Sequence, residues 1–411
     1  MKVKLIDGMS LLLVCWFGGS CAPAQDFDNC LKSIVAPYRF SIVKWEAKVI
    51  FDEANQWLFS RNEKIDDEVH LVIQYFSLVE RVEMLNSEIE ATNGSGQGDL
   101  TSLEAELSRL QEQKAALQDI VERIIERQIR ETLAQQGIFN PIDEYIKLEV
   151  GFPPLNFKLD NPPYLLVISP RDKIESMREI TLLPSLSLEE IEDIEARVDK
   201  LGVSSLVVEL GGFGAIYPSF VADDASLRFT IDTATEEWLH QYLAFKPLGF
   251  LYLLDLTGVS RNYEIATMNE TLASMVSKEI GSIIYEKYYS WYEDGYSQNQ
   301  GAGSGFDFNQ EMREIRREVD KYLAQGEIER AEEFMEQKRQ YLASMGYYIR
   351  KLNQAYFVFH GTYADSPTSV SPIGIELKEL REQSASLKDF LDTVAVMTSR
   401  QDLRDSRVNV L

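Results

Sequence analysis

The longest regular pattern of apolar positions lies between residues 66 and 136. In the second half of this region the apolar residues recur at alternating intervals of four and three, which is a heptad seam. Residues 93–98 read Asn-Gly-Ser-Gly-Gln-Gly, a run that ends helices. The first arm is marked by Val72, Val79, Val82 and Ile89, and the second by Leu103, Leu107, Leu110, Lys114, Leu117, Val121 and Ile124. The pattern predicts an antiparallel coiled-coil hairpin within a helical region over residues 30–136.

The polar faces of this hairpin are rich in Glu, Arg and Gln, as expected of solvated surfaces. We interpret the hairpin as a spacer or lever, and a binding surface at its tip is the alternative. On the first interpretation, a chain without residues 70–134 should still fold downstream. Before the hairpin, an amphipathic helix is expected to begin near Pro37, since proline suits the first helical turn.

Short apolar runs replace the heptads over residues 150–292. Tyr164–Ser169 and Ser205–Leu210 have strand length, and residues 216–221 are expected to form a third strand. Pro218 places that third strand at a sheet edge, because proline cannot donate to a ladder. We expect an edge strand of this small sheet to hold an extended substrate by backbone hydrogen bonds.

Local signals place the neighbouring helix and turn. Ser187 is an N-cap with Glu190 three residues later, a capping box that opens a helix ending at Gly202. Residues 211–214, Gly-Gly-Phe-Gly, lack the spacing of a phosphate-binding loop and are interpreted as a turn.

The remainder is predicted to be helical. Residues 293–307 read as a flexible linker of Gly, Ser, Gln and Asn, followed by a helical subdomain over residues 308–400. This subdomain should contain two charged helices parted at Gln325-Gly326, and the tail beyond Arg400 is expected to be frayed. The predicted fold class is therefore α+β, mainly helical, with a small sheet.

Residues 1–24 resemble an export signal. Lys2 and Lys4 precede an apolar stretch from Met9 to Phe17 that is too short to span a bilayer. Two processing sites remain open: Ala22-Pro23-Ala24 fits a signal-peptidase site, and Gly-Gly-Ser-Cys21 resembles a lipoprotein box. With a lipid on Cys21, the protein would be extracytoplasmic and held at the membrane of a bacterial cell envelope. No disulfide framework is expected, because Cys30 would then be alone in the mature chain.

Charge removes several classes of function. The 411-residue chain has a formal net charge of −25 and a sequence pI of about 4.6. Such a chain repels nucleic acid and anionic lipid headgroups, so neither is expected as a partner.

Candidate chemistry gathers in a predicted helix that reads Thr-Glu236-Glu237-Trp-Leu-His240. Glu236 and His240 lie four residues apart and so share one face. Trp238, Tyr242 and Phe245 have the spacing of a buried face. In the H-E-x-x-H motif two histidines at this spacing bind zinc, and the intervening Glu takes a proton from the water on the metal. Here a carboxylate, which can also bind zinc, stands at the first ligand position.

A second segment, Asn269-Glu270-Thr271-Leu272-Ala273, follows on the next predicted helix. Together with Thr-Glu-Glu-Trp-Leu-His-Gln-Tyr-Leu, it resembles the gluzincin zinc metallopeptidases, in a bacterial branch with membrane-attached members, over residues 160–290 and more weakly to 395. The resemblance implies metallopeptidase activity on a peptide or protein. It implies metal ligands Glu236, His240 and Glu270, with Glu237 as the general base. His360 or Tyr363 is expected to stabilise the oxyanion.

Glu236 departs from the pattern of that group and leaves two interpretations open. Two carboxylates neutralise a divalent ion, which weakens it as a Lewis acid, so manganese is an alternative to zinc. Otherwise the chain is a catalytically lapsed relative that binds a protein partner, with Glu236 paired to a cation such as Arg261.

Overall fold

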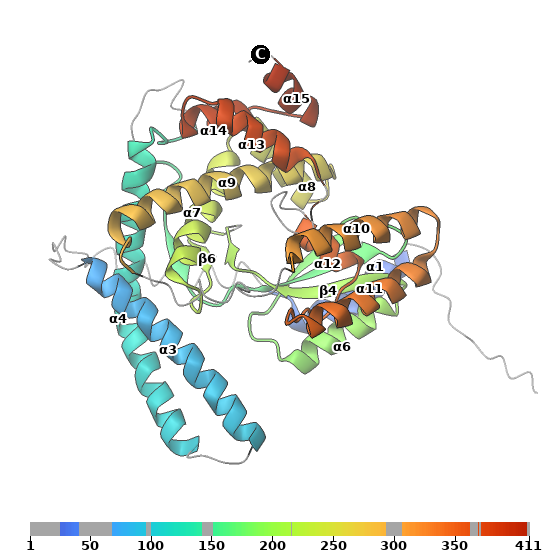
Figure 1. Cartoon of the computed structure of the whole chain (residues 1–411), viewed down its shortest axis with the longest axis horizontal. Coiled ribbons are helices and arrows are strands. Elements are labelled where there is room, and N and C mark those ends of the chain that lie inside the picture. Colours follow the sequence, from blue (N-terminus) through green and yellow to red (C-terminus); the bar gives the residue numbers. More distant parts are fainter. Residues whose placement is uncertain are drawn as a thin grey trace, which may run out of the picture.

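The computed structural model describes residues 25–40, 68–95, 100–141, 151–214, 216–292, 306–361, 369 and 371–408. Within these ranges the protein is mainly helical with two small sheets, so the predicted α+β class is confirmed (Figure 1). The predicted signal, residues 293–305 of the linker and Tyr363 lie outside the described residues. The prediction of a helix beginning near Pro37 is wrong at its start: a helix ends at Val35, residues 36–38 form a single 3-10 turn, and the chain is extended at Arg39 and Phe40. None of the described helices combines the length and apolar character needed to cross a bilayer.

The first sheet has β2 (Tyr164–Pro170) at its centre. It pairs antiparallel with β3 (Arg178–Leu182) on one side and β4 (Val203–Glu209) on the other. The helices α1 (Gln25–Val35) and α6 (Leu188–Asp199) cover one face, and α12 (Gln354–Gly361) covers the other. The predicted strands β2 and β4 and the capping box of α6 are confirmed, whereas β3 was not predicted.

Both edges of this sheet are occupied by other parts of the chain. Beside β3, Phe40 N donates to Thr181 O at 3.1 Å, following the short helix η1 (Ala36–Tyr38). On β4, Val207 N donates to a carboxylate oxygen of Glu195 at 2.7 Å, and Arg350 donates to Val207 O. Thr181 on β3 and Val207 on β4 are therefore not available to an extended substrate.

The second sheet corrects two predictions. Its order is β1 (Phe157–Leu159), β6 (Ser219–Val221), β5 (Gly212–Phe213), so the strand predicted at an edge is central. Pro218 precedes the first paired residue and has no ladder bond to lose. The Gly-Gly-Phe-Gly segment, predicted to be a turn, contains the edge strand β5 instead.

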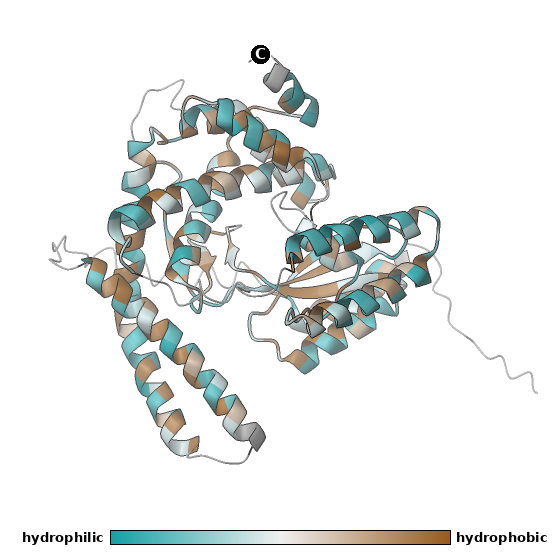
Figure 2. Ribbon diagram, in the orientation of Figure 1, coloured by the Kyte–Doolittle hydropathy of each residue, from teal (hydrophilic) through white to brown (hydrophobic). Residues whose placement is uncertain are grey.

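The main core is helical. It is built by α7 (Leu227–Leu243), α8 (Pro247–Leu256), α9 (Tyr263–Tyr288), α13 (Ile373–Gln383) and α14 (Leu387–Ala395), whose apolar sides meet around Leu239, Leu272 and Leu391. Teal outer faces and brown inner faces on these helices show the same division (Figure 2). The tail predicted to be frayed contains one more helix, α15 (Arg400–Val408). Arg400 begins it and donates to both oxygens of Glu376.

The hairpin of α3 (Glu68–Ser95) and α4 (Leu100–Gln135) projects from the core (Figure 1). Its distal half has a small apolar cluster of its own around Leu85 and Leu110. Residues of its basal half, such as Phe76 and Ile125, belong to the main core that contains α7 and α9. The prediction of a separable spacer is therefore wrong for the basal half, because removing residues 70–134 would expose that core.

The C-terminal pair of charged helices was predicted correctly. They are α10 (Phe308–Ala324) and α11 (Ile328–Ser344), and Gly326 between them has a positive φ of 75°. Their apolar faces form a separate cluster with Phe357 of α12.

Substituting Glu126 in α4 should change stability in a pH-dependent way. Burial raises the pKa of Glu126 from 4.5 to about 7, although Phe157 N donates to its Oε1. The unfolded chain ionises this group at lower pH, so its contribution to folding stability is complete below about pH 4.5 and is lost as pH rises to about 7. Glu126→Gln keeps the acceptor and should raise the free energy of unfolding at pH 8 by about 1–3 kcal/mol, with little change at pH 4.

Urea denaturation at both pH values measures this difference. The exposed Glu112 on the same helix supplies the control Glu112→Gln. An equal effect of Glu126→Gln at both pH values would contradict the prediction.

Candidate metal centre

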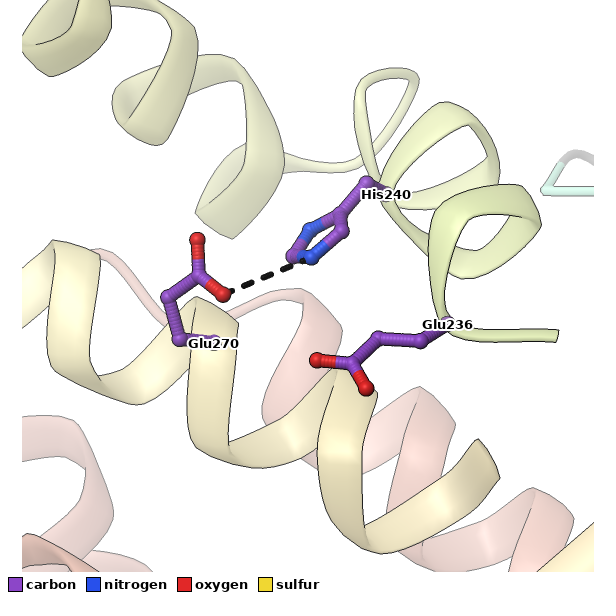
Figure 3. Close-up of side chains that lie close together, drawn as sticks. All are labelled: Glu236, His240 and Glu270. Carbon is purple, nitrogen blue, oxygen red and sulfur yellow. Dashed lines mark ion pairs between the residues drawn. The ribbon is translucent and has the colours of Figure 1, made fainter. Parts of the chain in front are cut away.

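Two capped helices present the candidate ligands. Ser226 accepts a hydrogen bond from Phe229 N and begins α7, and Asn262 accepts from the first turn of α9. The two helices pack closely along their lengths. Glu236 and His240 project from α7 towards α9, which carries Glu270 (Figure 3).

The three candidate ligands converge. One atom each of Glu236, His240 and Glu270 lies within 4.8 Å of the others. His240 Nε2 is 3.5 Å from Glu270 Oε2, the pair joined by the dashed line in Figure 3. Two ligands at about 2.1 Å from a tetrahedral ion are about 3.4 Å apart. The His240–Glu270 pair therefore already has the separation that a shared zinc ion requires.

A layer of partners orients these ligands. His240 Nδ1 lies 2.9 Å from Asn269 Oδ1, an acceptor, so Nδ1 donates to it and the ring is oriented with Nε2 facing Glu270. Tyr252 of α8 donates its hydroxyl to Glu270 Oε1. Outer hydrogen bonds of this kind are typical of metal-ligating histidines and carboxylates.

Tyr252 was not found from the sequence. It stands in Pro-Leu-Gly-Phe-Leu-Tyr-Leu-Leu, an apolar stretch in which nothing separates it from a core residue. Only the packing of α8 against α9 brings its hydroxyl to Glu270.

The electrostatics of the group favour a cation. Burial, with smaller contributions from Glu270 and Glu237, raises the pKa of Glu236 to about 8. Burial lowers the pKa of His240, but the surrounding carboxylates, Glu270 first, outweigh it and raise that pKa to about 10. Among the described residues, the buried Glu236 Oε1 has no hydrogen-bond partner. A divalent ion would supply both the missing partner and the compensating charge, so these residues fit a metal.

Glu237 lies one position along α7, against the edge strand β5. The N–H of Gly214 donates to its carboxylate, but burial prevails and raises the pKa of Glu237 to about 7. A Cβ on Gly212 or on Gly214 would come within 2.4 Å of a Glu237 carboxylate oxygen. These glycines are therefore required for the close approach of the backbone to Glu237.

Gly214→Ala should displace Glu237 without removing a ligand. The added methyl group would also meet Glu237 O at 3.0 Å, so the side chain has to move. Displacing a reacting group by about 1 Å can lower kcat by about 10- to 100-fold. Hydrolysis of quenched-fluorescence peptides should fall accordingly, while calorimetric metal affinity stays unchanged. Gly151→Ala, where a Cβ meets nothing within 4 Å, is the control, and a matching loss there would contradict the prediction.

The site opens into a cavity of about 500 Å³, the size of small-ligand pockets. One wall comes from α7, α8 and α9, and the other comes from the first sheet and α12. Glu237, His240 and Glu270 line the cavity. Glu236 is not part of the lining, and one of its carboxylate oxygens is buried. The backbone of residues 212–214 also forms part of the lining.

The structure does not bring every predicted residue to the site. Phe359 lines the cavity, but its neighbour His360 does not and instead packs against Tyr356, with ring centroids 4.2 Å apart and the ring planes tilted by 42°. Burial lowers the pKa of His360 to about 4. Phe245, predicted on the buried face of α7, lies beyond the end of the helix and is exposed. Arg261 lines the cavity and lies 4.0 Å from Asp255, and within the described part of the chain no ion pair joins it to Glu236.

Comparison with known proteins yields no relative: neither a protein-family model, nor a curated protein, nor a solved structure matches the chain.

Proposed function

We propose that this protein is a metal-dependent peptidase of gluzincin type. The observation that carries the proposal is the convergence of Glu236, His240 and Glu270 within 4.8 Å beside a cavity that Glu237 also lines. The group occurs where the helix spacing and the second segment of the sequence lead one to expect it. Zinc is the proposed ion, with manganese as the alternative.

Each residue has a distinct role in this proposal. Glu236, His240 and Glu270 hold the ion, which when bound would polarise a peptide carbonyl and acidify water. Glu237, held by Gly214, accepts the proton of the attacking water and passes it to the leaving amine. Its pKa near neutrality suits both halves of that transfer.

Tyr252 is a candidate for the role that was expected of His360 or Tyr363. Tyr252 lines the cavity beside Glu270, but its single hydroxyl proton is donated to Glu270 Oε1, so it would serve an oxyanion only by exchanging that bond. His360 and Tyr363 stay predictions, with no geometry at the site to support them.

The edge of β5 is the proposed support for an extended peptide. β5 pairs on one side with β6, and the backbone of residues 212–214 faces the cavity next to Glu237. Gly214 is already engaged, since its N–H donates to Glu237 and its O accepts from Gln241. The backbone groups proposed to hydrogen-bond a substrate strand are therefore those of Gly212 and Phe213. We therefore assign the role expected of the small sheet to the second sheet, because β5 lies beside Glu237.

The wider setting remains as the sequence indicates. The α3–α4 hairpin is proposed to be an antiparallel coiled coil whose distal half extends away from the site. The N-terminal segment is proposed to export the protein and to hold it at the extracytoplasmic surface of a membrane through a lipid on Cys21.

Calorimetric titration with zinc and with manganese tests the metal proposal. Wild-type protein purified without chelator should bind one ion per chain, and Glu236→His should bind zinc more tightly, since it removes one buried negative charge. A wild type that binds neither ion, with a site gained by Glu236→His, would identify a lapsed peptidase. Failure of both proteins to bind would refute the gluzincin assignment.

A further inference from the structure

A row of large apolar side chains is exposed along the outward side of α8. Phe250, Leu253 and Leu256 follow one another at intervals of three residues and are 56%, 43% and 44% exposed. We call these three residues the α8 face. Phe245, Val259 and Tyr263, beyond the two ends of the helix, extend the exposed apolar surface.

The opposite side of α8 is firmly packed. Leu248 is fully buried in the main core, and Leu251 packs against it. Gly249 allows close approach to the end of α7, since a Cβ there would lie 2.1 Å from Leu243 O. The α8 face is therefore held outward by a well-anchored helix. Exposed apolar surface that is contiguous, unlike scattered single residues, marks a binding site.

This surface is continuous with the cavity. Leu253 and Leu256 belong both to the α8 face and to the cavity lining. Across the cavity, Leu165, Val358 and Phe359 form an apolar wall. Because these two leucines belong to both surfaces, an apolar segment seated on the α8 face can extend into the cavity, whose lining also includes Asp255 and Arg261.

We infer that the α8 face binds the large apolar side chains of an extended polypeptide and leads that polypeptide into the cavity. The substrate class is then unfolded or extended segments rich in Leu and Phe. The continuity with the cavity favours a polypeptide over a lipid surface, because a bilayer would cover the face without entering. The inference rests on the proposed function for the fate of the peptide, but not for its binding.

Binding can be measured apart from catalysis. The probe is a fluorescein-labelled 12-residue peptide with blocked ends, in which Leu and Phe alternate with Ser; a second peptide has Ala at every apolar position. Fluorescence anisotropy with the full chain carrying Glu237→Gln should give a dissociation constant at least about 10-fold lower for the Leu/Phe peptide. Leu253→Asp and Leu256→Asp should each weaken that binding about 10-fold or more, as loss of a buried leucine contact implies.

Leu188→Asp is the matched control. Leu188 is an exposed leucine (58%) at the start of α6, on the opposite face of the first sheet, and an acid is tolerated at a helix N-terminus. This variant should bind both peptides like its parent.

The outcomes separate the two proposals. Equal affinity for the two peptides, or equal loss in Leu188→Asp, would overturn the inference. A third result would also overturn it: the protein binds phosphatidylcholine vesicles but not the peptides, and Leu253→Asp abolishes the vesicle binding. The α8 face would then be a lipid-binding surface. If the wild type takes up no metal but still binds the Leu/Phe peptide more tightly than the Ala peptide, the inference stands and the peptidase proposal is refuted.

Discussion

Glu237→Gln is expected to lower kcat for peptide hydrolysis by about 10²- to 10⁴-fold while leaving the metal bound. The substitution removes the proton acceptor, and general-base catalysis contributes an effect of this size. The shape of the side chain is kept, and the amide oxygen of Gln can still accept from the N–H of Gly214. The metal ligands are unchanged, so metal content and affinity should match those of the wild type.

Two measurements on the same preparations check this result: hydrolysis of a quenched-fluorescence peptide library, and zinc content by elemental analysis. Glu286→Gln, an exposed acid on α9, is the control. Hydrolysis that survives Glu237→Gln undiminished would remove Glu237 from the mechanism. Loss of the metal together with activity would make Glu237 a ligand.

His240→Ala is expected to weaken zinc or manganese binding by at least about 100-fold. Changing only an outer partner of a metal ligand costs about 10- to 100-fold, so removing the imidazole itself should cost more. The substitution also leaves Asn269 Oδ1 without the imidazole and the neighbouring carboxylates without their cation, so a fall in stability accompanies it.

A stability loss alone would obscure this result, and His360→Ala separates the two effects. It removes a histidine whose pKa is also lowered by burial but which does not line the cavity. Circular dichroism shows whether each variant is folded, and titration calorimetry then measures metal affinity. His240→Ala protein that is folded and binds metal like the wild type would remove His240 from the ligand set. Metal loss in His360→Ala would mean that the binding site lies elsewhere.

Local features of the chain were predictable because their causes are local. A capping box depends on two residues three positions apart, and Ser187 with Glu190 does begin α6. The spacing of Glu236 and His240 places both on one face of any helix that contains them. The hairpin arms were visible because a repeat of apolar positions survives in sequence whatever the helices pack against.

Features that depend on contacts between distant segments were not predictable. The sequence indicates that three of the residues 211–214 are glycines, but not that β5 forms there against β6 or that Glu237 lies over it. Likewise Pro218 suggests an edge strand, yet it lies one residue before the first paired residue and so removes no hydrogen bond between the strands. The heptads did not reveal that the basal half of the hairpin completes the main core.

For the candidate site, the sequence by itself determined that Glu236, Glu237 and His240, three of the candidate residues, share one helix. Only the tertiary structure decided that Glu270, thirty residues after His240, comes to 3.5 Å from its imidazole. The same packing of α7, α8 and α9 brought Tyr252 to Glu270 and left His360 outside the cavity lining. Helical periodicity fixes the direction of a side chain only relative to its own axis, whereas the approach of two axes depends on how their apolar faces pack.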